Sequence, residues 1–365
     1  MSVCNNFPKL KNDTIIRAAR GEKTEYVPVW IMRQAGRYLP EFQEVRKKHS
    51  FFEICRTPSL ACEITLQPIR RFNLDAAIIF SDILVIPQAL GMIVEMKPGV
   101  GPVLPNPLSI PDDLEKLNYP CDVDKELGYV FEAVTLTRHT LEGKVPLIGF
   151  SGAPWTLMSY MIEGGGSKTM SLSKGWLYKY PESSHKLLKI LTEVIVDYLV
   201  GKVKAGAQLL QLFESHAEFL GPKLFLTYSL PYIKQIKSQV NSKLVELGIP
   251  TVPFILFAKG SCIVIDHIIE SGYDVLSLDW TISPTEARKK VKDIASVQGN
   301  LDPCALKAKP TEIECLVKDM ITDFGTQKYI ANLGHGIYPD IDPGHIEVFV
   351  NSVQRISREL NIPVK

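Results

Sequence analysis

The sequence predicts an α/β fold, a single (β/α)8 TIM barrel with an active-site cleft at the C-terminal ends of its strands. Short apolar runs alternate with helical segments, and no break in composition marks a linker between them. Polar residues follow where these runs stop, which is the edge where such barrels keep their active sites. The runs expected to form strands are residues 28–32, 75–80, 146–150, 209–213, 252–258, 275–280, 296–300 and 329–333.

The segments between these runs show helical periodicity. Pro68 lies inside one of them and is expected to kink or end it, and Asp342 or a neighbour is expected to cap the last helix. Residues 87–111 are rich in Pro and Gly and are interpreted as an excursion. The expected helices are residues 14–20, 39–48, 58–72, 127–141, 182–204, 224–247, 263–271, 285–291, 312–324 and 343–360.

Composition places the chain among ordinary globular proteins, with 365 residues, 45% hydrophobic and 22% charged. A formal net charge of +1 argues against broad binding of nucleic acid or of anionic membranes. The first fifty residues differ, because they hold ten Lys or Arg against five Asp or Glu. This segment can therefore present a positive field to an anionic ligand.

Cysteine usage predicts a reducing compartment, and the protein is expected to be cytoplasmic. The cysteines are odd in number, without a C-x-x-C pair or histidines at metal-finger spacing, so neither a disulfide framework nor a zinc site is expected. No secretory signal is expected. Residues 145–162 lack charge, but Ser, Gly, Pro and Thr interrupt them, so no membrane span is expected. The seven cysteines are Cys4, Cys55, Cys62, Cys121, Cys262, Cys304 and Cys315.

The candidate site residues come directly after the apolar runs. Arg33 and Arg37 follow the first run, and Gly36 allows the backbone to bend between them. Arginine presents a fixed fork of charged donors, so this pair suits recognition of carboxylate or phosphate. The full set expected around one mouth of the barrel is Arg33, Arg37, Asp82, Ser215, Lys259, Asp279, Asn300 and His335.

Four motifs stand at or near the ends of the apolar runs, namely WIMRQAGRYLP at residues 30–40, GFSGAPWTLM at 149–158, FESH at 213–216 and NLGHG at 332–336. Together they resemble the uroporphyrinogen decarboxylase family of haem biosynthesis, in its eukaryotic cytosolic form. The resemblance covers about residues 28–343. It implies one domain over residues 1–365, in which residues 1–26 form an extension packed on or flanking the barrel.

The resemblance also implies an activity and its residues. Enzymes of the family convert the acetate side chains of uroporphyrinogen to methyl groups and yield coproporphyrinogen, without metal or organic cofactor and usually as homodimers. The implied catalytic residues are Asp82, Arg37 and His335. The implied substrate-binding residues are Arg33, Arg37, Asp82, Tyr160, Ser215 and His335.

The chemistry of this substrate agrees with those residue types. Fixed cations suit its eight carboxylates, and one ionised carboxylate at Asp82 can accept several inward pyrrole N–H groups. Protonation of the pyrrole α-carbon makes the ring an acceptor for the electrons released with carbon dioxide. The proton donor stays open between His335, whose ordinary pKa suits general acid work, and Arg37, because arginine seldom releases a proton.

Each candidate also has a structural alternative. Asp82 could cap a helix, although Ser81 beside it could do so instead, and His335 between glycines could serve a tight turn. Glu214, Ser215 and His216 are not expected to form a relay, because adjacent residues of a strand point apart. Without a role at the site, Tyr160 would be a core or surface residue, and His216 and Cys262 would be packing residues. Lys259, Asp279 and Asn300 are expected to be lining or structural residues.

Three other interpretations compete with this assignment. Residues 164–169 resemble a phosphate-binding loop, but no glycine directly precedes Lys168 and no strand precedes the loop, so a mobile loop is favoured. The alternative enzyme is a corrinoid-dependent methyltransferase of the same barrel superfamily, which binds zinc through His-x-Cys. The sequence contains no His-x-Cys. A porphyrin carrier would not need both Asp82 and a titratable His335.

Overall fold

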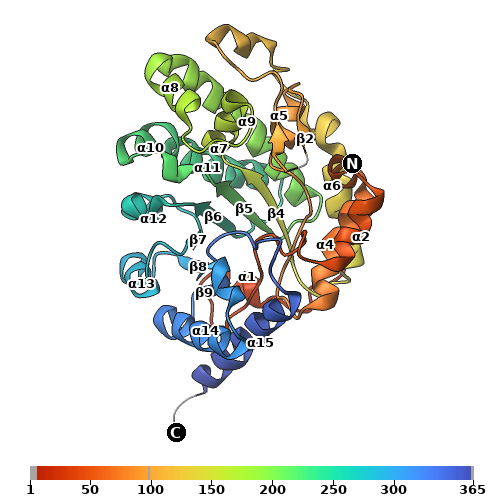
Figure 1. The fold of residues 1–365 in the computed structure, drawn as a ribbon, viewed down its shortest axis with the longest axis vertical. Helices are drawn as coiled ribbons and strands as arrows, with labels where there is room; N and C mark the ends of the chain where they lie inside the picture. Colours follow the sequence, from red (N-terminus) through yellow and green to blue (C-terminus); the bar gives the residue numbers. More distant parts are fainter. Residues whose placement is uncertain (1–5, 98, 363–365) are drawn as a thin grey trace.

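A curled sheet of seven parallel strands forms the centre of the protein. The computed structural model describes residues 6–97 and 99–362, so Cys4 lies outside the described residues. Each strand pairs with the next in chain order, and the sheet curls into a half-barrel (Figure 1). In spatial order the strands are β1 (Ala77–Ile78), β4 (Leu147–Gly152), β5 (Leu209–Glu214), β6 (Phe254–Ala258), β7 (Val275–Ser277), β8 (Ser296–Leu301) and β9 (Tyr329–Leu333).

Helices surround this sheet, and most of them lie on its outer face (Figure 1). They lie at α1 (Thr14–Ala19), α2 (Pro40–Lys48), α3 (Phe51–Arg56), α4 (Pro58–Arg71), α5 (Val85–Ala89), α6 (Val123–Thr140), α7 (Pro154–Glu163), α8 (Ser171–Lys179), α9 (Pro181–Lys204), α10 (Pro222–Tyr228), α11 (Leu230–Glu246), α12 (Ile265–Ile269), α13 (Pro284–Val291), α14 (Pro310–Phe324) and α15 (Pro343–Asn361). Short 3-10 helices are η1 (Pro111–Lys116), η2 (Ala217–Phe219), η3 (Ser261–Val264) and η4 (Pro303–Lys307).

The single long helix predicted over residues 224–247 is wrong, because two helices occupy this range. α10 ends at Tyr228 and α11 begins at Leu230. Pro231 stands in the first turn of α11, where its missing N–H and fixed φ suit a helix start and not a helix interior. Pro68, by contrast, is accommodated inside α4, which continues to Arg71. The predicted cap of α15 is confirmed, since Asp342 accepts a hydrogen bond from Gly344 N–H at 2.7 Å.

Residues 28–32, predicted to be the first strand, do not form a strand. Val29 makes one isolated parallel bridge to Ala331 of β9. Asp75 N–H donates to Val29 O, and Ala331 N–H donates to Pro28 O, each at 2.8 Å. The segment therefore has backbone hydrogen bonds on both sides, to β9 and to the residues just before β1.

In this segment, side-chain oxygens accept the backbone N–H groups that would otherwise bond to a neighbouring strand. Val29 N–H donates to Asp75 Oδ2 at 2.9 Å, and Met32 N–H donates to Asn332 Oδ1 at 2.9 Å. Pro28 has no N–H to offer. Backbone groups that side chains have satisfied are not available to a neighbouring strand, which explains why an apolar run with strand-like composition stays irregular.

Two hydrophobic clusters divide the core between the two faces of the sheet. Leu209, Ile255 and Val275 belong to the cluster on the concave face, whereas the alternate residues Leu210 and Leu212 pack toward the helices. Both faces are thus buried, and this accounts for the continuous apolar runs in the sequence.

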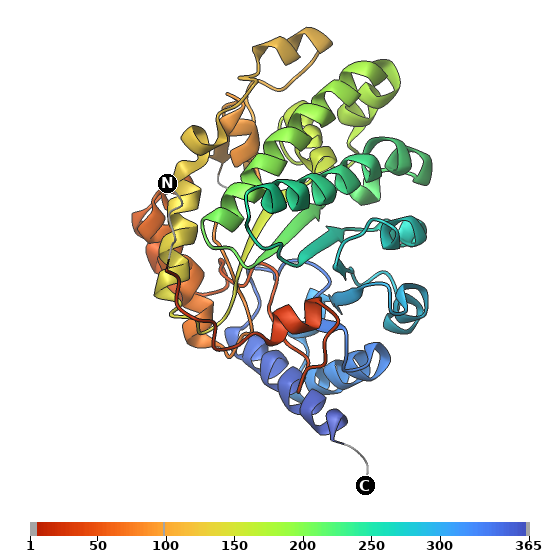
Figure 2. The same ribbon diagram turned by 180° about the vertical axis from the view of Figure 1, so that it is seen from behind.

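Helix α1 closes the concave face. Ile15, Ala18 and Ala19 belong to the same cluster as the inward strand residues. Figure 2 shows α1 lying across the sheet when the molecule is seen from behind. Ser296 Oγ donates to Ala18 O at 2.7 Å and ties α1 to β8. The N-terminal segment therefore fills the sheet's interior in addition to flanking it.

The predicted excursion contains a two-stranded hairpin of β2 (Glu95–Lys97) and β3 (Gly101–Val103). It docks on the end of α7, since Val103 bridges to Gly165 and Leu104 N–H donates to Gly164 O at 2.9 Å. Among the described helices, none combines the length and apolar character needed to cross a bilayer.

Replacing Ile15 by Ala should destabilise the fold, because Ile15 is fully buried and fills the concave side of the sheet. A cavity of this kind costs about 2–5 kcal/mol of unfolding free energy. The matched control is Ile294→Ala, whose side chain is exposed and whose loss should change stability by less than about 0.5 kcal/mol. Urea denaturation measures both. Equal stability of the two variants would contradict the packing role of α1.

Candidate active site

The sequence-predicted residues follow the carboxyl ends of the strands. Arg33 and Arg37 lie in turns after residues 28–32, Asp82 follows β1, Ser215 follows β5 and His335 follows β9. Tyr160 comes from α7, the helix after β4. Parallel pairing brings these strand ends to the same edge of the sheet.

The pKa of Arg33 is influenced by several other residues of this group. Burial lowers the pKa of its guanidinium, and the like charge of Arg37 acts in the same direction. Asp82 opposes this lowering by its negative charge, and Tyr160 and Tyr338 oppose it only in their ionised phenolate forms. Charges influence one another in this way only at short range, so the structure brings Arg33, Arg37, Asp82 and Tyr160 together.

The position of Arg33 depends on an unusual backbone and on a glycine far away in the sequence. Its φ is +66°, in the left-handed region that side chains other than glycine seldom adopt. Its side chain crosses Gly336, where an added Cβ would lie 2.3 Å from Arg33 Cδ. Only a residue without a side chain leaves room there.

Asp82 is a partly buried carboxyl held by the backbone. Its Oδ1 accepts a hydrogen bond from Leu84 N–H at 3.0 Å. Burial raises the pKa of Asp82, while the N–H groups of Leu84 and Ile83 and the charge of Arg33 counteract the rise. Asp82 does not cap α5, and neither does Ser81, because that helix begins at Val85 with Leu84 at the N-cap and no capping side chain.

His335 does not keep the ordinary histidine pKa that the sequence suggested. Burial is the main cause that lowers its pKa to about 4, and the charge of Arg33 adds to it. Nδ1–H donates to Gly336 O at 3.2 Å. The rings of Trp280 and Tyr338 each lie 6.2 Å from the imidazole ring. The free protein therefore holds His335 neutral at pH 7.

The neighbours of Ser215 in the sequence, Glu214 and His216, form hydrogen bonds with residues of other segments. Glu214 is fully buried and accepts hydrogen bonds from Thr156 Oγ1 and from Ser229 Oγ. Its burial raises its pKa to about 7. His216 Nδ1 lies 2.6 Å from Ser159 Oγ. Both side chains bind residues other than Ser215, so the expectation that these three residues form no relay is confirmed.

Three further strand-end residues make structural bonds. Lys259 Nζ pairs with Glu218 Oε1 at 2.6 Å. Asp279 Oδ1 accepts from Thr281 N–H at 2.8 Å, and Asn300 Nδ2 donates to Asp279 O at 2.9 Å. Lys259, Asp279 and Asn300 thus fit the lining or structural role expected of them.

Sequence reasoning missed Tyr338 and Trp280, which place aromatic rings beside His335. The sequence feature that could have indicated Tyr338 is its position just after the NLGHG motif. For Trp280 the only such feature is its place at the end of a predicted strand.

Metal and phosphate sites receive no support from the described residues. Among them, no three His, Cys, Asp or Glu side chains are grouped so that they could hold a metal ion. The glycines at 164–166 follow helix α7 and not a strand, and Gly164 ends that helix in the left-handed conformation. A phosphate-binding loop would need a strand before it.

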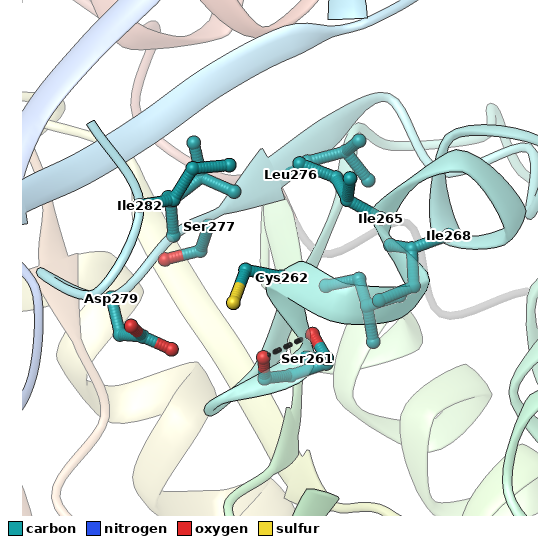
Figure 3. A pocket seen from close by; sticks show the side chains of 11 residues that line it. Ser261, Cys262, Ile265, Ile268, Leu276, Ser277, Asp279 and Ile282 are labelled. Carbon is teal, nitrogen blue, oxygen red and sulfur yellow. Dashed lines mark hydrogen bonds between the residues drawn. The ribbon is translucent and has the colours of Figure 1, made fainter. Parts of the chain in front are cut away.

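A small cavity lies between β6, η3 and β7 (Figure 3). Cys262, Ser277 and Asp279 border one side of it, and Ile265 and Ile268 border the other. Its volume of about 20 Å³ suits a single water molecule. It is therefore too small to bind an organic substrate and is distinct from the group around Arg33.

A curled parallel sheet with arginines, a carboxylate and a histidine at its carboxyl edge defines an α/β enzyme of the barrel-like class with a cationic site. Comparison with known proteins narrows this class. The family described as uroporphyrinogen decarboxylase (URO-D) matches residues 10–356, further at both ends than the four motifs indicated. The chain belongs to the uroporphyrinogen decarboxylase family.

Relatives match almost the whole length. The protein named uroporphyrinogen decarboxylase from Homo sapiens is 60% identical over 354 residues, which cover 97% of this chain and 96% of the human protein. The protein of the same name from Salinibacter ruber is 53% identical over 355 residues, covering 97% and 99%. Among solved structures, a methyltransferase from Methanosarcina mazei has a TM-score of 0.79 at 20% identity, covering 95% of this chain and 99% of that one. This last likeness concerns the fold alone.

His335 should titrate near pH 4 in the free protein, because burial and Arg33 both disfavour the imidazolium. Its folded pKa lies below the ordinary value, so the unfolding free energy should fall as the pH is lowered from about 6.5 to about 4. NMR of the histidine ring carbons, with His335→Gln for assignment, measures the midpoint.

Arg33→Gln is the matched variant for this titration. It removes the nearby positive charge, so the His335 midpoint should move upward. A wild-type midpoint above about 6 would contradict the buried, neutral state of this ring.

Proposed function

We propose that this protein decarboxylates the four acetate side chains of uroporphyrinogen III to methyl groups, giving coproporphyrinogen III and carbon dioxide. Membership of the family, with named relatives at 60% identity over 97% of the chain, supports the reaction. The structural observation that carries it is Asp82, a partly buried carboxyl beside Arg33 at the carboxyl edge of the sheet. The test is release of carbon dioxide from uroporphyrinogen under anaerobic conditions.

The substrate's outer carboxylates would bind Arg33 and Arg37. A guanidinium can hold a carboxylate through two parallel hydrogen bonds. Both arginines have exposed side chains, and that of Arg33 crosses Gly336, so the two can serve different carboxylates. Tyr160 and Ser215 would add neutral donors.

Asp82 would accept the pyrrole N–H groups at the centre of the macrocycle. Oδ1 already accepts Leu84 N–H, so its remaining lone pairs and Oδ2 are the acceptors available to substrate. Burial raises the pKa of Asp82, which means that the protein disfavours the charge in the absence of ligand. A cationic ring beside it would favour that charge strongly, because attraction grows as water is excluded.

The reaction needs one proton for each acetate that it converts. A proton adds to the pyrrole α-carbon, the bond to the carboxylate breaks, and its electron pair enters the cationic ring as carbon dioxide leaves. The resulting exocyclic carbon then takes up a proton to become methyl, and the α-carbon returns its proton. Asp82 stabilises the ring by its charge at the two stages in which the ring is positive, before carbon dioxide leaves and after the exocyclic carbon is protonated.

The proton donor belongs to the pair Arg37 and His335. His335 is neutral in the free protein. Substrate carboxylates would counteract the positive charge of Arg33, and the pKa of His335 would then rise toward the operating pH. The rings of Trp280 and Tyr338 lie beside the imidazole, each with its centroid 6.2 Å away.

The proposal also covers architecture and assembly. Residues 28–32 would occupy the eighth strand position of one (β/α)8 barrel domain over residues 1–365, and support comes from the bridge between Val29 and Ala331. A homodimer and a cytoplasmic location remain predictions, which sedimentation and cell fractionation test. The corrinoid-dependent methyltransferase is not favoured, because the relatives carry the decarboxylase name and the sequence lacks His-x-Cys.

Asp82→Asn should reduce kcat by on the order of a hundredfold to a thousandfold. Asn Oδ1 can still accept Leu84 N–H, so the turn is preserved, but the charge opposite the protonated ring is lost. Substrate should still bind through the arginines. Steady-state kinetics with anaerobic uroporphyrinogen measures the effect, after circular dichroism has shown that the variant is folded.

Asp293→Asn is the control, because this carboxyl is 91% exposed and lies away from the strand ends. It should leave kcat unchanged. If Asp82→Asn kept kcat within about threefold of wild type, a change well under 1 kcal/mol, Asp82 would not stabilise the transition state.

Arg37→Lys should lower kcat/KM by about tenfold or more, because lysine keeps the charge but loses the planar fork. Both binding and turnover should suffer. The same substitution at Arg355, a half-exposed residue of α15, provides the comparison. Unchanged kinetics for Arg37→Lys would assign Arg37 to the solvated surface.

A further inference from the structure

His216 lies beside Tyr160 and contacts its ring. The centroids of the two rings are 4.9 Å apart, with 39° between their planes. His216 is partly buried, and Phe219 packs edge-on against its ring at 5.9 Å. The Tyr160 ring therefore has an aromatic support on the side that faces His216.

Hydrogen bonds fix the His216 ring in one orientation and one tautomer. Ser159 Oγ lies 2.7 Å from Thr156 O and 2.6 Å from His216 Nδ1. A carbonyl can only accept, so the single hydroxyl proton of Ser159 goes to Thr156 O. Nδ1 of His216 must then carry a proton and donate it to Ser159 Oγ. The ring cannot flip without losing this bond.

The backbone of His216 is tied to the same helix. Trp155 Nε1 donates to His216 O at 3.0 Å, and His216 N–H donates to Thr156 Oγ1 at 3.3 Å. Thr156 Oγ1 donates in turn to the buried carboxylate of Glu214. The first turn of α7 and the turn after β5 are thus joined by side-chain and backbone bonds on both sides of Ser215.

We infer that His216 is a positioning residue that sets the orientation of Tyr160 toward the substrate. Ser159, whose Oγ accepts the hydrogen bond from His216 Nδ1, directly precedes Tyr160 on α7. His216 thus holds two neighbouring residues, Ser159 by a hydrogen bond and Tyr160 by a ring contact. This inference rests on the proposed function, which places Tyr160 against the substrate. It gives His216 a role beyond the packing that its sequence context suggested.

A double-mutant cycle tests this role through kcat/KM for uroporphyrinogen. His216→Asn keeps an N–H near the place of Nδ1 but removes the ring that supports Tyr160. Tyr160→Phe keeps the tyrosine ring but removes its hydroxyl. We expect His216→Asn to lower kcat/KM about tenfold in the wild-type background and less than about twofold in the Tyr160→Phe background, because the hydroxyl that His216 places is then absent.

His345→Asn is the control. His345 makes a comparable bond from Nδ1, to Leu306 O at 2.7 Å, but lies on α15. Its effect should be small and equal in both backgrounds. An equal loss for His216→Asn in both backgrounds would overturn the positioning role, because a general structural defect is additive with Tyr160→Phe.

Ser159→Ala keeps the inference testable if His216→Asn does not fold. It removes the hydroxyl that accepts from His216 and should show non-additivity of the same sign with Tyr160→Phe. Additive losses would count against the inference. Failure of the proposed function is distinguishable, because the wild-type protein would then release no carbon dioxide from uroporphyrinogen.

Discussion

Parallel pairing of the strands is the constraint on which the rest of the structure depends. Neighbouring strands run in the same direction in fixed register, for example Glu214 of β5 opposite Ala258 of β6. The residues that follow them are therefore side by side, and Lys259 N–H donates to Glu214 O at 3.1 Å. Chemistry placed after each strand converges at one edge, however far apart the residues are in sequence.

Burial at that edge disfavours the charged forms of Arg33, Asp82 and His335 alike. It lowers the pKa of Arg33 and of His335 and raises the pKa of Asp82, so each shift disfavours the charged form. In the free site, nearby opposite charges and hydrogen bonds therefore do not fully offset the cost of burying the charged forms of these groups. A ligand with outer carboxylates and inner N–H donors supplies what each group lacks, and part of its binding free energy relieves this unfavourable state.

The strand order and most helices could be predicted because they depend on local periodicity. Seven of the predicted runs overlap strands of the sheet, since strands buried on both faces appear as continuous apolar segments. Residues 28–32 could not be predicted correctly, because the acceptors that replace their ladder bonds, Asp75 and Asn332, come from distant parts of the chain. The low pKa of His335 has the same origin, because it depends on burial in the folded protein and, less strongly, on the charge of Arg33.

The site residues were recognisable as motifs, but the physical link between the motifs became visible only in three dimensions. Arg33 requires a left-handed backbone of its own and a residue without Cβ at position 336. Gly336 also supplies the carbonyl that accepts His335 Nδ1–H. The first arginine motif and the NLGHG motif therefore form one structural unit, in which a glycine makes room for the guanidinium and holds the imidazole beside it. Each motif constrains the other through this contact, so neither can be changed without moving a charge at the site.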